Sequence, residues 1–188
     1  MPKSITFDRD QVMANVMKLF WEKGYNGTSM QDLVNVTGLN RSSFYNSFGD
    51  KFSLYEEALS LYQSQQMENL HQVLHPDQSP KEALVSLFKG ISSDIANGNK
   101  QGCMLSKCTS ELSAQEPRVM PFLKENKDRV VKLFATLIRK GQDEDEISRD
   151  KDPDTLALYL FVNLQGLKLT SMLETDLQQV TKQILKAL

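Results

Sequence analysis

Residues 27–55 read GTSMQDLVNVTGLNRSSFYNSFGDKFSLY, and this stretch decides the fold. Two hydroxyl residues open it: Thr28-x-x-Gln31 and Ser29-x-x-Asp32 both fit the spacing of a capping box. Either hydroxyl can therefore cap a first short helix. A glycine at position 38 ends that helix, because glycine readily takes the left-handed conformation that follows a helix.

A second short helix follows the glycine. Asn40 can cap it, and the helix then displays Arg41 and two serines while Phe44 and Phe48, four residues apart, face the core. Two short helices joined by a tight glycine-containing turn indicate a helix-turn-helix, whose second helix lies in the DNA major groove. The sequence thus predicts a DNA-binding domain over residues 1–50 and a second domain over residues 51–188.

The same stretch resembles the N-terminal region of the TetR family of bacterial regulators. The residues that carry the resemblance are Thr28, Gly38, Leu39, Ser42, Phe44, Tyr45, Phe48, Lys51 and Leu54. Ser47 departs from the pattern, since histidine or tyrosine is common there. A second segment, QGCMLSKCTSEL at residues 101–112, is similar to one in the branch that includes the repressor of N-ethylmaleimide reductase.

The resemblance implies a set of DNA contacts. Tyr45 and Lys51 would contact phosphates, with Ser47 as a further candidate, and Ser29 or Thr28 would cap the first helix and touch the DNA backbone. The residues expected at bases are Gln31, Arg41, Ser42 and Ser43. The chemistry of these residues agrees, because arginine can donate two hydrogen bonds to guanine. The helix N-termini at Thr28 or Ser29 and at Asn40 also offer free N–H groups to phosphates.

Outside this stretch the chain reads as helical throughout. Glycine and proline total only 15 of 188 residues, and apolar residues recur at helical spacing. We expect an all-α fold of about nine helices. The expected segments are 8–23, the two short helices, 51–70, 80–96, 103–112, 117–141, 153–173 and 176–188.

Charge is the feature that opposes DNA binding. The net charge is −2, and residues 1–55 carry six basic and five acidic side chains. Residues 142–154 hold seven acidic and two basic residues, so the acidity belongs to one loop. We therefore expect DNA recognition by a few well-placed groups, with a modest salt dependence.

The C-terminal part predicts a homodimer. Residues 156–173 are apolar on nearly every side of a helix, which requires burial on both sides. One side can meet its own chain and the other, together with Val180 and Ile184, a second copy across roughly residues 155–188. A central core helix in a monomer is the alternative interpretation.

The region between residues 54 and 141 is expected to receive an unknown small-molecule effector. The residues predicted to line the site are Phe88, Met104, Leu105, Phe122, Phe134 and Leu137, with Cys103 as a candidate sensor of electrophiles or oxidants. Cys103 would sit near a helix N-terminus, where the dipole lowers the pKa of a thiol. Lys100 and Lys107 are close in sequence and could assist, and Cys108 is the weaker candidate. A small buried cysteine that only packs is the alternative.

Other site classes find little support in the sequence. Glu68, His71 and His75 share a helix face at a metal-binding spacing, but no further ligands accompany them, so solvated histidines are expected and no metal. No nucleophile–base pair, carboxylate pair or phosphate loop is evident, so we expect neither an enzyme nor a cofactor. No 18-residue apolar run or signal-type segment occurs, which predicts a cytoplasmic protein with no membrane partner.

Together these observations predict a homodimeric transcriptional repressor. It would bind a palindromic, double-stranded operator and be released by a small-molecule, electrophile or oxidant signal. A helical small-molecule or redox-binding protein with a vestigial helix-turn-helix is the alternative from another functional class, and the low basic charge favours it.

Overall fold

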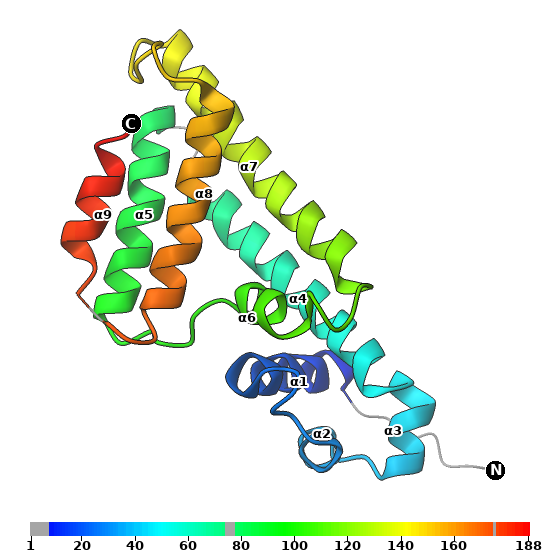
Figure 1. The fold of residues 1–188 in the computed structure, drawn as a ribbon. Helices are drawn as coiled ribbons and strands as arrows, with labels where there is room; N and C mark the ends of the chain where they lie inside the picture. The colour runs from blue at the N-terminus through cyan, green and yellow to red at the C-terminus, as the bar shows by residue number, and fades with distance from the viewer. Residues whose placement is uncertain (1–7, 74–77, 175) are drawn as a thin grey trace.

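A computed structural model describes residues 8–73, 78–174 and 176–188. Figure 1 shows helices α1–α3 gathered at one end and a bundle of helices at the other, with α4 running between the two. The described residues form nine α-helices and no strand, as the sequence predicts: α1 (Arg9–Lys23), α2 (Met30–Thr37), α3 (Arg41–Phe48), α4 (Lys51–Val73), α5 (Pro80–Ala96), α6 (Met104–Leu112), α7 (Val119–Asp143), α8 (Pro153–Thr170) and α9 (Gln178–Leu185).

Helix starts are set by local capping. Ser29 rather than Thr28 caps α2: its side chain accepts from the Asp32 N–H, and the Asp32 carboxylate accepts from the Ser29 N–H in return. Asn40 caps α3 in the predicted way, accepting from the Ser43 N–H at 2.9 Å. Asp152 caps α8 ahead of a proline in the first turn. These starts are confirmed because they depend only on neighbouring residues.

Three predicted helix boundaries differ from the structure by a few residues. Pro117 lies in a turn, and α7 begins at Val119 because the Val119 and Met120 N–H groups still bond to carbonyls of that turn. Gly141 does not end α7, which continues to Asp143. A Cβ atom on Gly141 would lie 2.8 Å from Cδ1 of Ile147, so this glycine allows the following loop to pack closely against the helix. The last helix is also shorter than the predicted 176–188.

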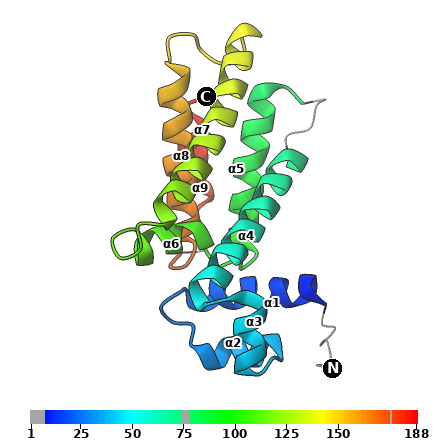
Figure 2. The ribbon, with the colours of Figure 1, turned by 90° about the vertical axis from the view of Figure 1, so that its right-hand side faces the viewer.

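The buried residues form two hydrophobic clusters. The first combines α1–α3 with the N-terminal half of α4 and with α6, and the second combines α5 and α7–α9 with the far end of α4. Helix α4 therefore belongs to both, and Figure 2 shows it leading from α1–α3 into the bundle. Helix α6 lies beyond the predicted domain boundary at residue 50, yet its apolar side belongs to the first cluster.

Candidate DNA-binding surface and effector cavity

Helix α3 presents two opposite faces. Phe44 and Phe48 are 0% and 3% exposed and contact each other with ring centroids 5.6 Å apart. Arg41, Ser42 and Tyr45 lie on the outer side, where Tyr45 is 51% exposed. Burial of the two phenylalanines fixes the helix to the domain, so its polar face is held at the surface in one orientation.

The structure brings most of the predicted DNA-contacting residues to this surface. Those that are exposed are Ser29, Gln31, Asn40, Arg41, Ser42 and Tyr45, and those that are half-buried are Ser43, Ser47 and Lys51. Thr28 is the exception, and its predicted contact with the DNA backbone conflicts with its burial. It is 1% exposed and its hydroxyl donates to the Gly24 carbonyl at 2.7 Å, which stabilises the turn after α1.

Charged groups around the α2–α3 unit are largely engaged with one another. Lys23 Nζ lies 2.7 Å from Asp32 Oδ1, and this ammonium, with the Ser29 hydroxyl, holds the pKa of Asp32 well below its ordinary value. Lys51 Nζ lies 4.3 Å from the ring centroid of Tyr25, and burial lowers the pKa of Lys51. Lys23 and Lys51 are therefore engaged within the domain, whereas Arg41 is exposed.

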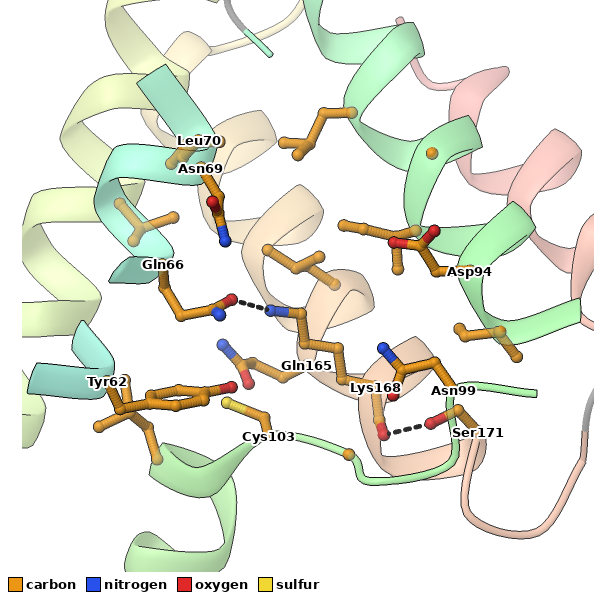
Figure 3. A pocket seen from close by; sticks show the side chains of 18 of the residues that line it. Tyr62, Gln66, Asn69, Leu70, Asp94, Asn99, Cys103, Gln165, Lys168 and Ser171 are labelled. Carbon is orange, nitrogen blue, oxygen red and sulfur yellow. Dashed lines mark hydrogen bonds between the residues drawn. The ribbon is translucent and has the colours of Figure 1, made fainter. Parts of the chain in front are cut away.

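A cavity of about 370 Å³ lies between α4, α5, α8 and the segment that leads into α6. Figure 3 shows Gln66 and Asn69 on its α4 side, Asp94 on its α5 side, and Gln165 and Lys168 on its α8 side. The Lys168 ammonium donates to Gln66 Oε1 at 3.1 Å. The volume of the cavity lies at the lower end of the range of about 300–1,000 Å³ found for small-molecule sites.

Of the residues predicted to line an effector site, Cys103 and Leu105 line this cavity. Phe88 and Phe134 are fully buried in the second hydrophobic cluster, whereas Met104 is buried in the first and Phe122 packs against it. The prediction was wrong for these four because an apolar residue at helical spacing looks the same whether it fills a core or lines a cavity.

The two cysteines differ in their surroundings. Cys103 is 4% exposed and occupies the N-cap position of α6, where its side chain makes no capping hydrogen bond. Figure 3 shows its sulfur beside the Tyr62 hydroxyl. Cys108 is fully buried, and this burial raises the pKa of its thiol to about 11, so it stays protonated at neutral pH. Cys103 is therefore the better placed of the two to meet a molecule in the cavity.

The predicted help from lysines to Cys103 is not seen. Lys107 Nζ donates to the Trp21 carbonyl at 2.7 Å and lies 3.5 Å from the Glu22 carbonyl, both at the end of α1. Its charge thus stabilises the C-terminus of α1, where the helix dipole is negative. Lys100 lies exposed in the segment before α6.

Helix α6 connects the cavity to the DNA-binding helices. The Glu111 carboxylate accepts from the N–H groups of Tyr25 and Asn26, at 2.7 and 3.1 Å, in the turn between α1 and α2. On the other side, the Ser106 hydroxyl donates to Gln165 Oε1 of α8 at 2.6 Å. A displacement of α6 would therefore be transmitted directly to α1 and α2.

Sequence reasoning missed the polar residues of the cavity. Lys168 and Gln165 were available as a signal, since they are a cation and an amide three residues apart in an otherwise apolar helix. That spacing places them on one helix face. Glu111 had no local signal, because its partners lie about 85 residues away in the chain.

An apolar surface remains uncovered on α8, the turn after it and α9. Its members, each between 42% and 91% exposed, are Leu158, Tyr159, Val162, Leu169, Met172, Leu173 and Val180. Seven exposed large apolar residues fall between positions 158 and 180, and exposed apolar patches mark interaction surfaces.

A metal site and a membrane-spanning helix are the two remaining candidates. Among the described residues, no group of three histidine, cysteine, aspartate or glutamate side chains could hold a metal ion. His71 is exposed, and His75 lies outside the described residues. None of the helices in the described ranges combines the length and hydropathy needed to cross a bilayer.

Comparison with known proteins agrees with this geometry at both ends of the chain. Residues 14–58 match the model of the bacterial regulatory proteins of the tetR family, and residues 80–186 match the tetracyclin repressor-like C-terminal domain. The chain belongs to the TetR family. The second match shows that the family relationship extends beyond the helix-turn-helix into the helices that form the cavity and the apolar surface.

Relatives of this TetR-family chain are transcriptional regulators. It is 26% identical over 171 residues to the regulator YezE of Bacillus subtilis, covering 90% of this chain and 88% of the relative. It is 28% identical over 177 residues to the transcriptional repressor ComR of Escherichia coli, covering 93% and 84%.

Solved structures share the fold over the whole chain. A cysteine-substituted variant of the TetR-family regulator CifR, complexed with a 26-base-pair double-stranded operator, is 25% identical with a TM-score of 0.85 and covers 100% of this chain and 99% of its own. The reduced form of NemR from Escherichia coli has a TM-score of 0.82 at 16% identity, covers 95% and 93%, and shows likeness of fold alone.

Proposed function

We propose that this TetR-family protein is a transcriptional repressor that binds a palindromic, double-stranded DNA operator as a homodimer. The observation that carries the proposal is α3, which is capped by Asn40, anchored by two buried phenylalanines, and displays Arg41, Ser42 and Tyr45 outward. That arrangement suits a recognition helix lying in the major groove.

The proposed contacts divide into two kinds. Arg41 and Ser42 reach base edges, with Gln31 and Ser43 beside them, and Arg41 suits guanine because it can donate two hydrogen bonds. Tyr45 and Lys51 hold phosphates, as do the N-terminal N–H groups of α2 and α3. Thr28 is left out of the set because its hydroxyl is bound within the domain.

The proposed dimer forms through the apolar surface of α8 and α9. A helix-turn-helix dimer reads two half-sites about 34 Å apart, which a single copy cannot span. Burial of Leu158, Val162 and Leu173 against a second copy would remove their apolar area from water and supply the driving force.

Release from DNA is proposed to begin in the cavity. A ligand there, or an electrophile bonded to the Cys103 sulfur with loss of the thiol proton to solvent, would act on the N-terminus of α6. Glu111 and Lys107 then carry the displacement to α1 and α2, which changes the spacing of the two recognition helices. An effector need favour the non-binding state by only a few kcal/mol.

The test is a gel-shift titration with the DNA upstream of the protein's own gene, together with gel filtration. We expect one retarded complex of a dimer on a palindromic segment, competed by the unlabelled segment and not by scrambled DNA. Absence of a specific complex on any promoter fragment would favour the alternative protein with a vestigial helix-turn-helix. A stable monomer at the concentrations used would contradict the dimer.

The signal is tested separately with N-ethylmaleimide on the DNA-bound protein. We expect the wild type to be released from DNA. Cys108→Ser should also be released, because the thiol that it removes is buried and protonated in the wild type. Cys103→Ser should remain bound to DNA. Release of Cys103→Ser from DNA at the wild-type rate would show that Cys103 is not the residue that senses the electrophile.

A further inference from the structure

Lys168 is the one cation among the described residues that line the cavity. It lies on α8, half-buried, with its ammonium donating to the neutral amide oxygen of Gln66 at 3.1 Å. No carboxylate of the described residues is paired with its Nζ within 4.0 Å. A cation drawn partly out of water normally needs an opposite charge to offset its desolvation.

Asp94 is the single acid among the described lining residues, and it does not fill this role. It is exposed on α5, and Figure 3 shows its carboxylate on the opposite side of the cavity from Gln66, away from the Lys168 ammonium. The groups closer to Lys168 are the amides of Gln66, Asn69 and Gln165, which are neutral. The positive charge in the cavity is therefore left uncompensated by the protein.

A second observation is independent of Lys168. Trp21 of α1 also lines the cavity, and its indole Nε1 is buried with no hydrogen-bond acceptor among the described residues. Buried donors nearly always have an acceptor, and the indole N–H can only donate. The residue that carries this donor thus lines the same cavity as the uncompensated cation.

Much of the remaining lining is apolar, although Ser86, Asn99, Asn126 and Ser171 also contribute to it, and the space is small. Met67, Leu87, Ile91 and Leu164 contribute to the walls of a cavity of about 370 Å³. One cation, with no arginine among the described lining residues, matches a single negative charge, whereas a phosphate dianion would leave its second charge without a partner.

We propose that this cavity binds a small carboxylic acid with an apolar body, whose carboxylate accepts hydrogen bonds from Lys168 and whose chain lies against the apolar walls. The inference rests on the proposed function, since it names the class of the effector. The ligand would also lie against Trp21, a residue of the DNA-binding unit, so that ligand binding would act directly on α1.

The experiment uses the fact that Trp21 is the single tryptophan of the chain. Its fluorescence and the midpoint of thermal unfolding are measured on the full-length protein with straight-chain acids from butanoate to decanoate and with benzoate. Each acid is paired with its primary amide, and the matching alkyl amine and alkyl phosphate are included. We expect at least one acid to change the emission and raise the midpoint, and its amide and amine to bind at least tenfold more weakly.

Variants then test the assigned cation. Lys168→Gln should weaken the binding of the acid by about 10- to 100-fold, as expected for a charge-assisted hydrogen bond, and leave the amide unchanged. Lys168→Arg should retain the acid, and Lys89→Gln, an exposed lysine of α5 outside the cavity lining, is the matched control. If Lys168→Gln does not fold, the comparison of acid with amide in the wild type decides.

The proposal is overturned if amides or amines bind as well as the acids, if alkyl phosphates bind more tightly, if no acid binds, or if Lys168→Gln binds the acid normally. Operator binding by the unliganded protein is measured in parallel. Specific binding to DNA with no response to acids would defeat the ligand class alone, whereas the absence of any DNA binding would defeat the proposed function.

Discussion

Helices α3 and α6 are of nearly equal length and contribute to the same hydrophobic cluster, but they are held in different ways. Helix α3 starts at a side-chain cap on Asn40 and buries one face through Phe44 and Phe48. Helix α6 starts at Cys103 without a side-chain cap, and its polar side chains bond to α1 and α8.

This difference assigns the two helices different parts in a switch. The position of α3 within its domain follows from its own sequence, so it can present the same polar face to DNA at all times. The position of α6 depends on contacts to two other helices, α1 and α8, both of which also line the cavity. A helix placed by long-range contacts is the one that a ligand can displace.

The largest effect is expected from Phe44→Ala. Phe44 is fully buried, so its loss should destabilise the protein by about 3–5 kcal/mol in urea or thermal unfolding and reduce operator binding as a consequence. Tyr45→Ala is the matched control on the opposite face; it should change stability by less than about 1 kcal/mol while still weakening operator binding. Equal destabilisation by the two variants would contradict the view that the inner face of α3 anchors the helix while its outer face is free of the core.

The contacts of α6 are tested by Glu111→Ala. Removal of this carboxylate leaves the Tyr25 and Asn26 N–H groups without their acceptor, at a cost of about 1–3 kcal/mol. Hydrogen exchange at these two amides should accelerate, and operator affinity should fall although Glu111 touches no DNA. Glu125→Ala, which removes an exposed ion pair on α7, is the control and should leave both unchanged.

The local cap of α3 predicts a smaller effect for Asn40→Ala. Loss of the hydrogen bond to the Ser43 N–H should destabilise by about 1 kcal/mol in chemical denaturation. Asn40→Asp keeps a capping oxygen and should restore stability, but its charge should weaken operator binding. If Asn40→Asp bound DNA as well as the wild type, the N-terminus of α3 would not face a phosphate.

The smallest expected effect is that of salt on operator affinity. Few cations of the α2–α3 unit are free, since Lys23 is paired with Asp32 and Lys51 lies on Tyr25. The logarithm of affinity against that of salt concentration should therefore have a shallow slope, on the order of a few ions per dimer. A slope near −10 between low and moderate salt would show that phosphate neutralisation, rather than the face of α3, dominates.

The accuracy of the sequence predictions followed the range of the interactions involved. The caps at Asn40 and Asp152 and the inward orientation of Phe44 and Phe48 were predicted correctly, because each depends on residues within a few positions. The contact with the DNA backbone predicted for Thr28 does not fit the structure. Its hydroxyl donates to the Gly24 carbonyl instead, and only the turn after α1 brings that carbonyl within reach.

The effector site was the poorest prediction. Phe88, Met104, Phe122 and Phe134 proved to pack in or against the two hydrophobic clusters, while the cavity is lined in part by amides and by Lys168. Hydrophobic periodicity indicates which face of a helix is covered, but not whether side chains or an empty space cover it.

The sequence by itself determined the all-α class, the helix-turn-helix and the face of α3 that looks outward. Capping residues, the left-handed glycine at position 38 and the spacing of apolar residues act within one or two turns of the chain. The tertiary structure alone decided that α6 joins the DNA-binding helices, that Lys168 enters a cavity, and that Trp21 lines the same space. Those outcomes depend on how helices that are far apart in the sequence pack together. The burial of a side chain and the compensation of its charge are defined only after this packing has formed.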